Sequence, residues 1–432
     1  MTNETVTEPT PDAPLSETAR TESTRSLRAP IVYAVLGLAA LILFGLTSPG
    51  DQHSTFGLSE SSDFFQFSPL GVPSKLTAVA LGIVCLVIAG YSLVATIRHK
   101  TVPVVLPYVF GVAWVLAFLV WAIAGKQISF VSLIQGSLIL AVPLVFGSMA
   151  GILCERSGVV NIAIEGQLLA GAFLSAVVAT ITNNNWVGLL AAVAAGVAVS
   201  ALLAVFTIKY AVNQIIVGVV VNVLVLGLTS FLYSQVLADN GDKFNNPTGF
   251  GSLKIPLLGD IPVIGPIVFD QTVMVYMMYV VVIVLNVALF KTRWGLRVRA
   301  VGEHPQAADT LGVKVNRTRY FNVLLSGVVA GIGGAFFTLG SNIPFDKEMT
   351  AGKGYIALAA VIFGRWNPVG AFSAALLFGF ADNLQNILGI LRTPLPSEFL
   401  QMAPYLATIF AVAGLVGKSR PPAASGEPYT KG

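Results

Sequence analysis

The chain has 432 residues, 55% of them hydrophobic and only 11% charged, with a mean hydropathy of +0.79. Because soluble domains carry about 25% charged residues, this composition excludes a soluble globular enzyme. The net charge of +4 does not indicate nucleic-acid binding, since the basic residues stand in short loops between apolar runs.

Residues 1–28 come first and are rich in Thr, Glu, Pro and Ser, a composition typical of a disordered tail. A signal peptide would bring a short basic start directly before its apolar core, whereas this core begins only near Ile31. We expect the tail to stay attached to the protein and to lie in the cytoplasm.

A series of uncharged stretches follows the tail. A helix needs about 20 apolar residues to cross roughly 30 Å of hydrocarbon, so 166–208 is predicted to form two helices, with a turn at Asn183-Asn184-Asn185. Continuous apolar runs without strict alternation favour helices over a β-barrel. The stretches are 29–50, 76–97, 101–125, 127–154, 166–208, 210–238, 271–290, 320–345, 366–381 and 399–417.

The positions of Lys and Arg predict the orientation, because cytoplasmic loops carry an excess of both. If the tail's side is the inner one and the spans alternate, 17 of the 25 Lys and Arg residues fall inside and seven outside, with Arg365 unassigned. Both termini are therefore predicted to be cytoplasmic.

Polar side chains inside the apolar runs are the first candidates for contact with a solute. Glu165 opens a long uncharged run close to Asn161 and Gln167. A carboxylate at membrane depth is costly, so it pairs, faces a cavity or lies at the interface; Glu165 either organises packing or touches substrate. Amides such as Asn161 and Asn222 also bond neighbouring helices, for roughly 0.6–2 kcal/mol each, so only one or two of them are expected to touch a solute.

The loop 291–319 is the most informative inner segment, with seven Lys and Arg residues. Glu303, His304 and Pro305 favour the start of a helix, because proline is preferred in the first turn and an acid suits the helix dipole. The following residues continue the helix and Gly312 can end it. We expect a short amphipathic helix across the inner membrane face, which either is an ordinary basic loop or docks a partner below the membrane.

The segment 354–385 is not predicted to form one continuous transmembrane helix. Only 11 uncharged residues separate Lys353 from Arg365, about 16 Å of helix at 1.5 Å per residue. The sequence GRWNP at 364–368 then interrupts the helix, and irregular backbone survives in a membrane only against protein or a wet cavity. We expect a half-helix, a break and a second helix, and in total roughly ten to twelve transmembrane or half-membrane helices.

Residues that could form a reactive centre are sparse. The two cysteines, Cys85 and Cys154, lie in apolar runs, the three histidines are scattered, and the spans hold no cluster of acids, histidines or serine–base pairs. Gly417-Lys418-Ser419 resembles the end of a phosphate-binding loop, but Val412 stands where that motif needs its first glycine. We therefore expect no catalytic residue, no metal site and no bound cofactor in this chain.

Three motifs stand out at 157–167 (SGVVNIAIEGQ), 299–308 (RAVGEHPQAA) and 326–335 (SGVVAGIGGA). Together they resemble the permease subunits of bacterial ABC importers for branched-chain amino acids and simple sugars. The segments 354–368 (GYIALAAVIFGRWNP) and 421–429 (PPAASGEPY) resemble more narrowly the nucleoside branch of that family. The resemblance extends from about residue 130 to the C-terminus, and residues 1 to about 125 match less clearly.

The resemblance implies an all-α polytopic membrane protein with the ABC importer permease fold in 126–418, and 291–319 as its cytoplasmic coupling loop. Accessory transmembrane helices in 29–125, with an extracellular loop at 48–75, would precede this core, and a cytoplasmic tail at 419–432 would follow it. Coupling to an ATPase carries over to Gly302, Glu303, His304, Pro305, Ala307, Ala308 and Gly312.

It also implies an importer that moves nucleosides across the bacterial cell membrane. Its other parts would be a second, similar permease subunit, an ABC ATPase that binds ATP and Mg, and an extracellular lipid-anchored substrate-binding protein. The residues expected along the substrate pathway are Asn161, Glu165, Asn222, Trp366 and Asn367.

Two other functions stay open at this point. The chain could be an ABC permease for simple sugars or branched-chain amino acids. It could also be an ion-coupled secondary transporter, since those proteins likewise use broken helices and need no ATPase. An intramembrane enzyme is disfavoured because the spans lack a catalytic cluster.

Overall fold

The computed structural model describes residues 27–58, 66–103, 105–391, 402 and 420–430. Three predicted segments lie partly or almost wholly outside the described residues. They are nearly all of the tail 1–28, part of the loop 48–75, and the apolar stretch 399–417 except for residue 402. The structure therefore describes the segments between them and the short C-terminal segment 420–430.

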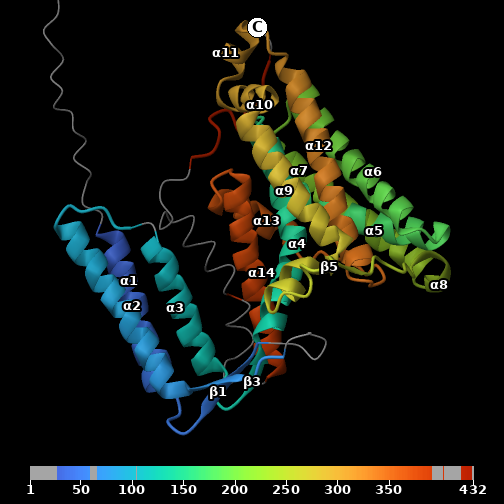
Figure 1. The fold of residues 1–432 in the computed structure, drawn as a ribbon. Helices are drawn as coiled ribbons and strands as arrows, with labels where there is room; N and C mark the ends of the chain where they lie inside the picture. The colour runs from blue at the N-terminus through green and yellow to red at the C-terminus, as the bar shows by residue number, and fades with distance from the viewer. Residues whose placement is uncertain (1–26, 59–65, 104, 392–401, 403–419, 431–432) are drawn as a thin grey trace, which may run out of the picture. The chain divides into compact units, whose positions relative to one another are not determined.

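Most described residues are helical (Figure 1). The α-helices are α1 (Arg28–Ala39), α2 (Ser74–Ile97), α3 (Val105–Ala122), α4 (Phe130–Glu155), α5 (Ile164–Thr182), α6 (Asn185–Ala204), α7 (Gln214–Leu232), α8 (Gly241–Phe244), α9 (Val273–Lys291), α10 (Arg293–Glu303), α11 (Pro305–Thr310), α12 (Val315–Ala335), α13 (Lys353–Phe363) and α14 (Pro368–Ile390). Short π-helical stretches are η1 (Ala40–Leu46), η2 (Val205–Lys209), η3 (Tyr233–Leu237), η4 (Gly265–Phe269) and η5 (Phe336–Gly340).

Nine helices in the described part of the chain are long and apolar enough to cross a membrane. They are α1 with η1, α2, α3, α4, α5, α6 with η2, α7 with η3, α9, and α12 with η5. The expected total of ten to twelve stays a prediction, because α13 is shorter than a full span and the 23-residue α14 is not among these nine. The predicted fold class, an all-α polytopic membrane protein, is confirmed.

Five short strands were not predicted from the sequence. β1 (His53–Gly57) pairs antiparallel with β2 (Leu70–Pro73) and parallel with β3 (Gln127–Ser129). β4 (Ser252–Lys254) pairs antiparallel with β5 (Asp270–Thr272). All are three to five residues long, too short for an alternating pattern to stand out in the sequence.

The chain packs into two compact units. The first comprises residues 1–47 and 76–118, and its helices α1, α2 and most of α3 meet around Cys85, Ile88 and Phe110. The second comprises residues 48–75 and 119–432 and holds all the strands and the remaining helices.

Helix α4 forms the centre of the second unit (Figure 1). Almost every side chain from Ala141 to Glu155 is buried, because α14, α12, α13 and α9 pack around this half of the helix. A helix that is apolar on all sides is expected when other helices surround it. The core of the unit is therefore helix packed on helix, with α4 as the common partner.

A close approach of α6 and α12 depends on glycine. A Cβ atom added at Gly196 would lie 2.2 Å from the carbonyl oxygen of Gly327, and one added at Gly327 would lie 2.5 Å from that of Gly196. Small residues at such positions let membrane helices pack backbone to backbone. Gly327 belongs to a glycine pair four residues apart, and its neighbour Gly331 contacts Ala192 in the same way.

Two predicted interruptions are confirmed. Asn183 ends α5 in the left-handed conformation, and the Asn184 side chain accepts hydrogen bonds from the first backbone N–H groups of α6. Between α13 and α14 the helix breaks at 364–367, where Arg365 and Trp366 both have positive φ angles. The segment 354–385 is thus a half-helix, a break and a second helix.

Candidate functional site

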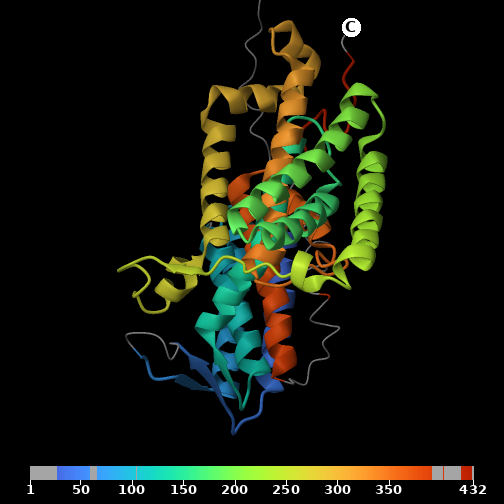
Figure 2. The same cartoon turned by 90° about the vertical axis from the view of Figure 1, so that its right-hand side faces the viewer.

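The segment that links α9 to α12 carries the predicted coupling residues. Thr292 lies between α9 and α10, and its hydroxyl accepts a hydrogen bond from the Gly295 N–H at 3.2 Å, which caps α10. α10 buries Gly295, Val298 and Val301, spaced three residues apart, so one face packs inward and the opposite face is free. In Figure 2, α10 runs across the ends of the two long helices that it connects.

The predicted short helix is present as α11. His304 closes α10 and precedes α11, Pro305 occupies the first position, and the Ala308 N–H donates to the His304 carbonyl at 2.9 Å. Gly312 follows in the left-handed conformation with φ +82°, while the Val313 N–H donates to the Ala308 carbonyl at 3.0 Å. The proline start and glycine end therefore act as the sequence predicted.

The seven predicted coupling residues divide into two groups by exposure. Only the exposed group can contact another polypeptide directly; Pro305 and Ala308 point inward from α11 instead. Leu311, which the sequence analysis did not single out, is 85% exposed directly after α11. The exposed members are Glu303, His304, Ala307 and Gly312, and the buried members are Gly302, Pro305 and Ala308.

Residues 420–430, which we call the C-terminal strap, pack on α10–α12. The Ala424 N–H donates to the Gly302 carbonyl at 2.9 Å, and the Ala423 N–H donates to the Glu303 carboxylate at 3.2 Å. Tyr429 is buried in an apolar cluster with Val301, Ala308, Val313 and Val315. The strap therefore holds the end of α10 and the inner face of α11 in place.

Arg319 joins the strap to α12. Its side chain is 2% exposed, and its Nη1 donates to the Glu427 carbonyl at 2.9 Å. At the end of the strap, burial and the neighbouring Asp309 carboxylate raise the pKa of Tyr429. Arg319 of α12 and Tyr429 of the strap thus both stabilise the contact between the strap and the α10–α12 segment.

The end of α10 also touches the end of α4. A Cβ atom at Gly302 would lie 2.3 Å from the Arg156 carbonyl, so only glycine fits there. The Arg156 side chain donates to the Trp366 carbonyl at 2.9 Å and to the Arg365 carbonyl at 3.4 Å. Burial lowers the pKa of Arg156, and the nearby Glu303 carboxylate opposes that effect. Through Arg156, the α10–α11 segment is connected to the break between α13 and α14.

The other end of α13 meets Glu165. This carboxylate accepts hydrogen bonds from the Thr350 hydroxyl at 2.6 Å, the Gly352 N–H at 2.9 Å and the Gly354 N–H at 2.6 Å. The N-terminus of a helix attracts negative charge because its first N–H groups have no partner within the helix. Glu165 thus supplies the acceptor for the N-terminal end of the half-helix.

A pocket of about 240 Å³ lies beside this contact. Its polar lining comes from Glu165, Asn222, Glu348, Thr350 and Tyr355. The Asn222 amide donates to the Tyr355 hydroxyl at 3.1 Å, while Tyr355 itself is 48% exposed. The pocket therefore offers a carboxylate, an amide, hydroxyls and an accessible aromatic ring. Such groups can bind a polar, uncharged molecule that has a flat ring.

Of the five predicted pathway residues, the structure brings Glu165 and Asn222 together and places the other three elsewhere. Asn161 is fully buried and donates to the Gln167 side chain at 3.1 Å. The Trp366 indole donates to the Glu155 carboxylate, and Asn367 caps α14 by accepting from the Val369 N–H at 2.9 Å. The roles of all five in transport stay predictions.

Thr350 and Tyr355 were missed by the sequence analysis. Ligand-binding groups cluster at the ends of broken membrane helices, and the sequence analysis applied that rule only to the GRWNP end of α13. Applied to the TAGKGY end at 350–355, the same rule would have indicated both residues. Glu348 carried no comparable signal, because acids in outer loops are common.

No group of three or more His, Cys, Asp or Glu residues that could hold a metal ion occurs among the described residues. Two ion pairs are found in that part of the chain, and one joins α13 to α14: the Lys353 ammonium lies 3.2 Å from the Asp382 carboxylate. The site thus consists of hydrogen-bonding groups and one partly buried ion pair.

Comparison with known proteins gives a consistent result. The family described as branched-chain amino acid transport system / permease component matches residues 133–416. The guanosine ABC transporter permease protein NupQ of Bacillus subtilis is 41% identical over 313 residues, 69% of this chain and 97% of that protein. The nucleoside ABC transporter permease protein NupC of Lactococcus lactis subsp. cremoris is 42% identical over 309 residues, 69% of this chain and 96% of that protein.

A putative glucose ABC transporter permease protein of Haloferax volcanii, TsgC13, is 33% identical over 291 residues, 62% of this chain and 87% of that protein. No solved structure matches the chain. The family match covers the half-helix α13, the α10–α11 segment and the pocket beside Glu165. The chain therefore belongs to the family of branched-chain amino acid transport system permease components.

Proposed function

We propose that this chain is the permease subunit of an ABC importer that carries nucleosides across the cell membrane. The supporting observation is its identity of 41–42% to two nucleoside permeases along almost their entire lengths. The 33% identity to a putative glucose permease is lower and covers less of both chains. ATP hydrolysis takes place on a separate ATPase subunit, which binds ATP and Mg.

The exposed side of α11 contacts the ATPase in this proposal. His304, Ala307 and Leu311 offer a small surface with an apolar end, on a helix that the C-terminal strap and α10 hold rigidly. A movement of α11 reaches α4 through the contact of Gly302 with Arg156, and reaches the α13–α14 break through Arg156. A packed, hydrogen-bonded connection of this kind can switch between two arrangements when the ATPase favours one of them.

The substrate passes the pocket of Glu165, Asn222 and Tyr355. The pocket is lined on one side by Val223 and Leu226 of α7, and the outer face of α7 is exposed in the single chain. A second, similar permease subunit would cover that face and complete the pathway. Aromatic side chains stack on nucleobases for roughly 1–3 kcal/mol, so Tyr355 is the residue that favours a nucleoside over a sugar or an aliphatic amino acid.

The remaining partner is an extracellular, lipid-anchored protein that delivers the nucleoside. The α10–α11 segment and both termini lie in the cytoplasm in this proposal; the excess of Lys and Arg in 291–319 supports the inner position of that segment. The predicted tail 1–28 and the accessory helices of 29–125 are additions to the transport core in this proposal.

The test uses the complete importer in liposomes, with ATP enclosed and the binding protein outside. We expect ATP-dependent accumulation of labelled guanosine or adenosine, which unlabelled nucleosides abolish and excess glucose or leucine leaves unchanged. Accumulation of glucose or leucine instead would assign the chain to the sugar or amino-acid branch. Uptake without ATP, driven by a proton or sodium gradient, would show a secondary transporter and overturn the proposal.

A pair of variants separates the aromatic ring of Tyr355 from its hydroxyl. Tyr355→Ala removes the ring and is expected to raise the nucleoside concentration at half-maximal uptake about tenfold, because the stacking energy of one base is lost. Tyr355→Phe keeps the ring, loses only the bond to Asn222, and is expected to change half-saturation by about threefold or less. Equal effects of the two substitutions would exclude stacking.

A further inference from the structure

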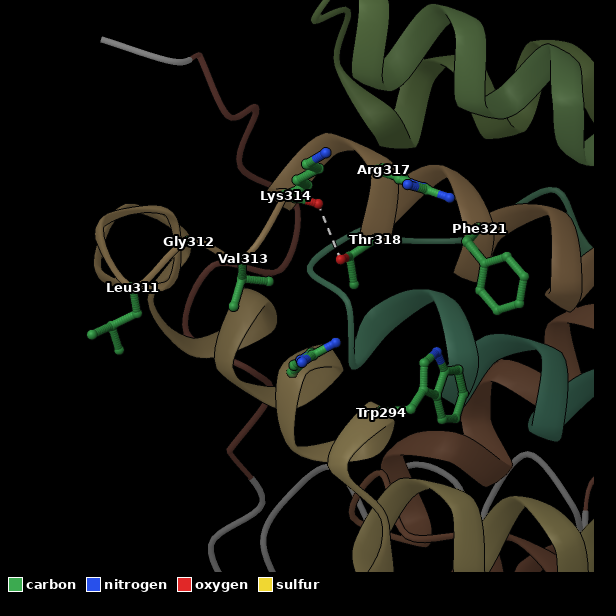
Figure 3. Close-up of a pocket in the computed structure, with 9 residues that line it drawn as sticks. Trp294, Leu311, Gly312, Val313, Lys314, Arg317, Thr318 and Phe321 are labelled. Carbon is green, nitrogen blue, oxygen red and sulfur yellow. Dashed lines mark hydrogen bonds between the residues drawn. The ribbon is translucent and has the colours of Figure 1, made fainter.

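A second hollow of the molecule lies apart from the proposed pathway, between α10 and the beginning of α12. Its volume is about 520 Å³. Figure 3 shows Trp294 on one side of it and Lys314, Thr318 and Phe321 on the other. The proposed importer function assigns no role to the hollow itself, although Leu311 of the ATPase-facing surface and Gly312 of the predicted coupling residues lie on its rim.

Three cations line the hollow: Arg297 from α10, and Lys314 and Arg317 from the start of α12. All three are exposed, and none of them has an ion-pair partner among the described residues. The two acids of the same loop are engaged elsewhere, because Glu303 accepts from the Ala423 N–H and Asp309 lies beside Tyr429. Like charges gathered without a counter-charge repel one another, so an anion that joins them is stabilised.

The wall of the hollow next to the cations is aromatic. The rings of Trp294 and Phe321 lie 6.4 Å apart and nearly perpendicular to each other. Phe321 is 54% exposed on α12, and Trp294 follows the end of α9. Both helices are membrane spans, so these rings lie where the spans leave the hydrocarbon, the level that Trp and other aromatic residues prefer.

A ligand that fits must therefore be anionic at one end and apolar at the other, and must be present where a span meets water. A membrane lipid with a phosphate headgroup meets all three conditions. Basic pockets between membrane helices at the surface of the bilayer are suited to such headgroups. The Thr318 hydroxyl donates to the Lys314 carbonyl at 3.1 Å and can accept a further bond from a headgroup hydroxyl.

We propose that the hollow formed by Trp294, Arg297, Lys314, Arg317 and Phe321 binds one anionic phospholipid, its phosphate on the three cations and its acyl chains along Phe321. The lipid joins α10 to α12 at residues other than Gly302 and Glu303, which the C-terminal strap contacts. This lipid binding does not depend on which solute the importer carries.

The test compares the assembled importer in nanodiscs of phosphatidylcholine alone and with rising fractions of phosphatidylglycerol. Bound lipids are counted by native mass spectrometry after transfer to detergent. We expect wild-type protein to retain one phosphatidylglycerol, and the triple variant R297Q/K314Q/R317Q to bind it about a hundredfold more weakly, since each cation near an anionic headgroup contributes roughly fivefold.

Two matched variants keep the result interpretable. The variant R98Q/K100Q/K209Q removes three exposed cations that the orientation rule also places on the inner side, and is expected to retain the lipid. The charge-preserving variant R297K/R317K is expected to retain it as well, which distinguishes loss of charge from misfolding. Excess inorganic phosphate is expected to leave the lipid in place.

Three outcomes would overturn the proposal. The first is an unchanged phosphatidylglycerol count in R297Q/K314Q/R317Q. The second is release of the ATPase from that variant with lipid retention unchanged, which would make the hollow a contact of the ATPase. The third is displacement by inorganic phosphate without any preference for the lipid, which would make it a site for a soluble anion. Loss of nucleoside uptake alone would concern the proposed function and not the lipid.

Discussion

At its N-terminal end α13 is held by one carboxylate, whereas at its C-terminal end it is held by one guanidinium. Glu165 accepts hydrogen bonds from Thr350, Gly352 and Gly354, and a pocket lies beside them. Arg156 donates to the carbonyls of the α13–α14 break, which is closely packed and adjoins α10. Each charge matches the pole of the helix that it faces.

The helix α13, with only 11 residues and a length of about 16 Å, therefore lies between the pocket at Glu165 and the helix break at Arg156. Its N-terminal end borders the pocket, and its C-terminal end is connected to the α10–α11 segment through Arg156. In the proposed function, a displacement at one end would reach the other end, because both ends are fixed by charged hydrogen bonds.

The largest effect is expected at the pocket end, for Glu165→Ala. Three donors lose their acceptor in a partly buried site, and hydrogen bonds to a charged group contribute about 1.5–3 kcal/mol each. We expect a fall in unfolding temperature and a loss of uptake of more than about tenfold. Glu348→Ala, in the same pocket but without those bonds, should leave the unfolding temperature unchanged. Equal stability of the two variants would contradict the assignment.

The next effect is expected on α11, where neighbouring alanines face opposite ways. Ala307 is exposed, so Ala307→Arg should leave the fold intact and block the ATPase, reducing its copurification and uptake about tenfold or more. Ala308 is buried against Tyr429, so Ala308→Arg should lower the unfolding temperature first. The measurements are pull-down of the ATPase and thermal unfolding. Identical behaviour of the pair would mean that α11 is not the docking surface.

A smaller effect is expected at the other end of α13, for Arg156→Lys. The positive charge remains, but a lysine cannot reach both carbonyls of the break in the same geometry. We expect ATP hydrolysis to continue while uptake per ATP falls about threefold. This factor corresponds to the loss of one hydrogen bond that contributes roughly 0.7 kcal/mol. Arg365→Lys, at an exposed side chain, serves as the control. A matched fall in hydrolysis and uptake would place Arg156 outside the connection.

The smallest effect is expected for Tyr429→Phe, with Tyr429→Ala as its stronger counterpart. The phenylalanine keeps the ring in the cluster with Ala308 and loses only the contact with Asp309, so uptake should change by less than about twofold. The alanine opens a cavity beside α11 and should lower uptake per ATP more clearly. If both variants equal the wild type, the strap has no part in coupling.

The sequence predicts those features of the molecule that depend on local chemistry. Uncharged length predicted the spans, Pro305 and Gly312 predicted both ends of α11, and GRWNP predicted the break after α13. Each of these signals lies within a few residues of the structure that it determines, so one sequence is sufficient to find it.

The remainder of the site depends on contacts between distant segments. The partners of Glu165 lie 185 to 189 residues further along the chain, and two of the three are backbone N–H groups that any residue provides. The strap binds through the backbone of Ala423 and Ala424, which carries no compositional signal. The sequence showed which residues stood out, but not that Ala308 faces inward while Ala307 faces outward.

The strap also has a consequence for biosynthesis. Residues 420–430 follow every described membrane helix, so they leave the ribosome after all of those helices have been made. Until then Val301, Ala308 and Val315 lack the tyrosine that covers them. A polypeptide that ends before residue 420 would therefore leave this apolar cluster uncovered by Tyr429.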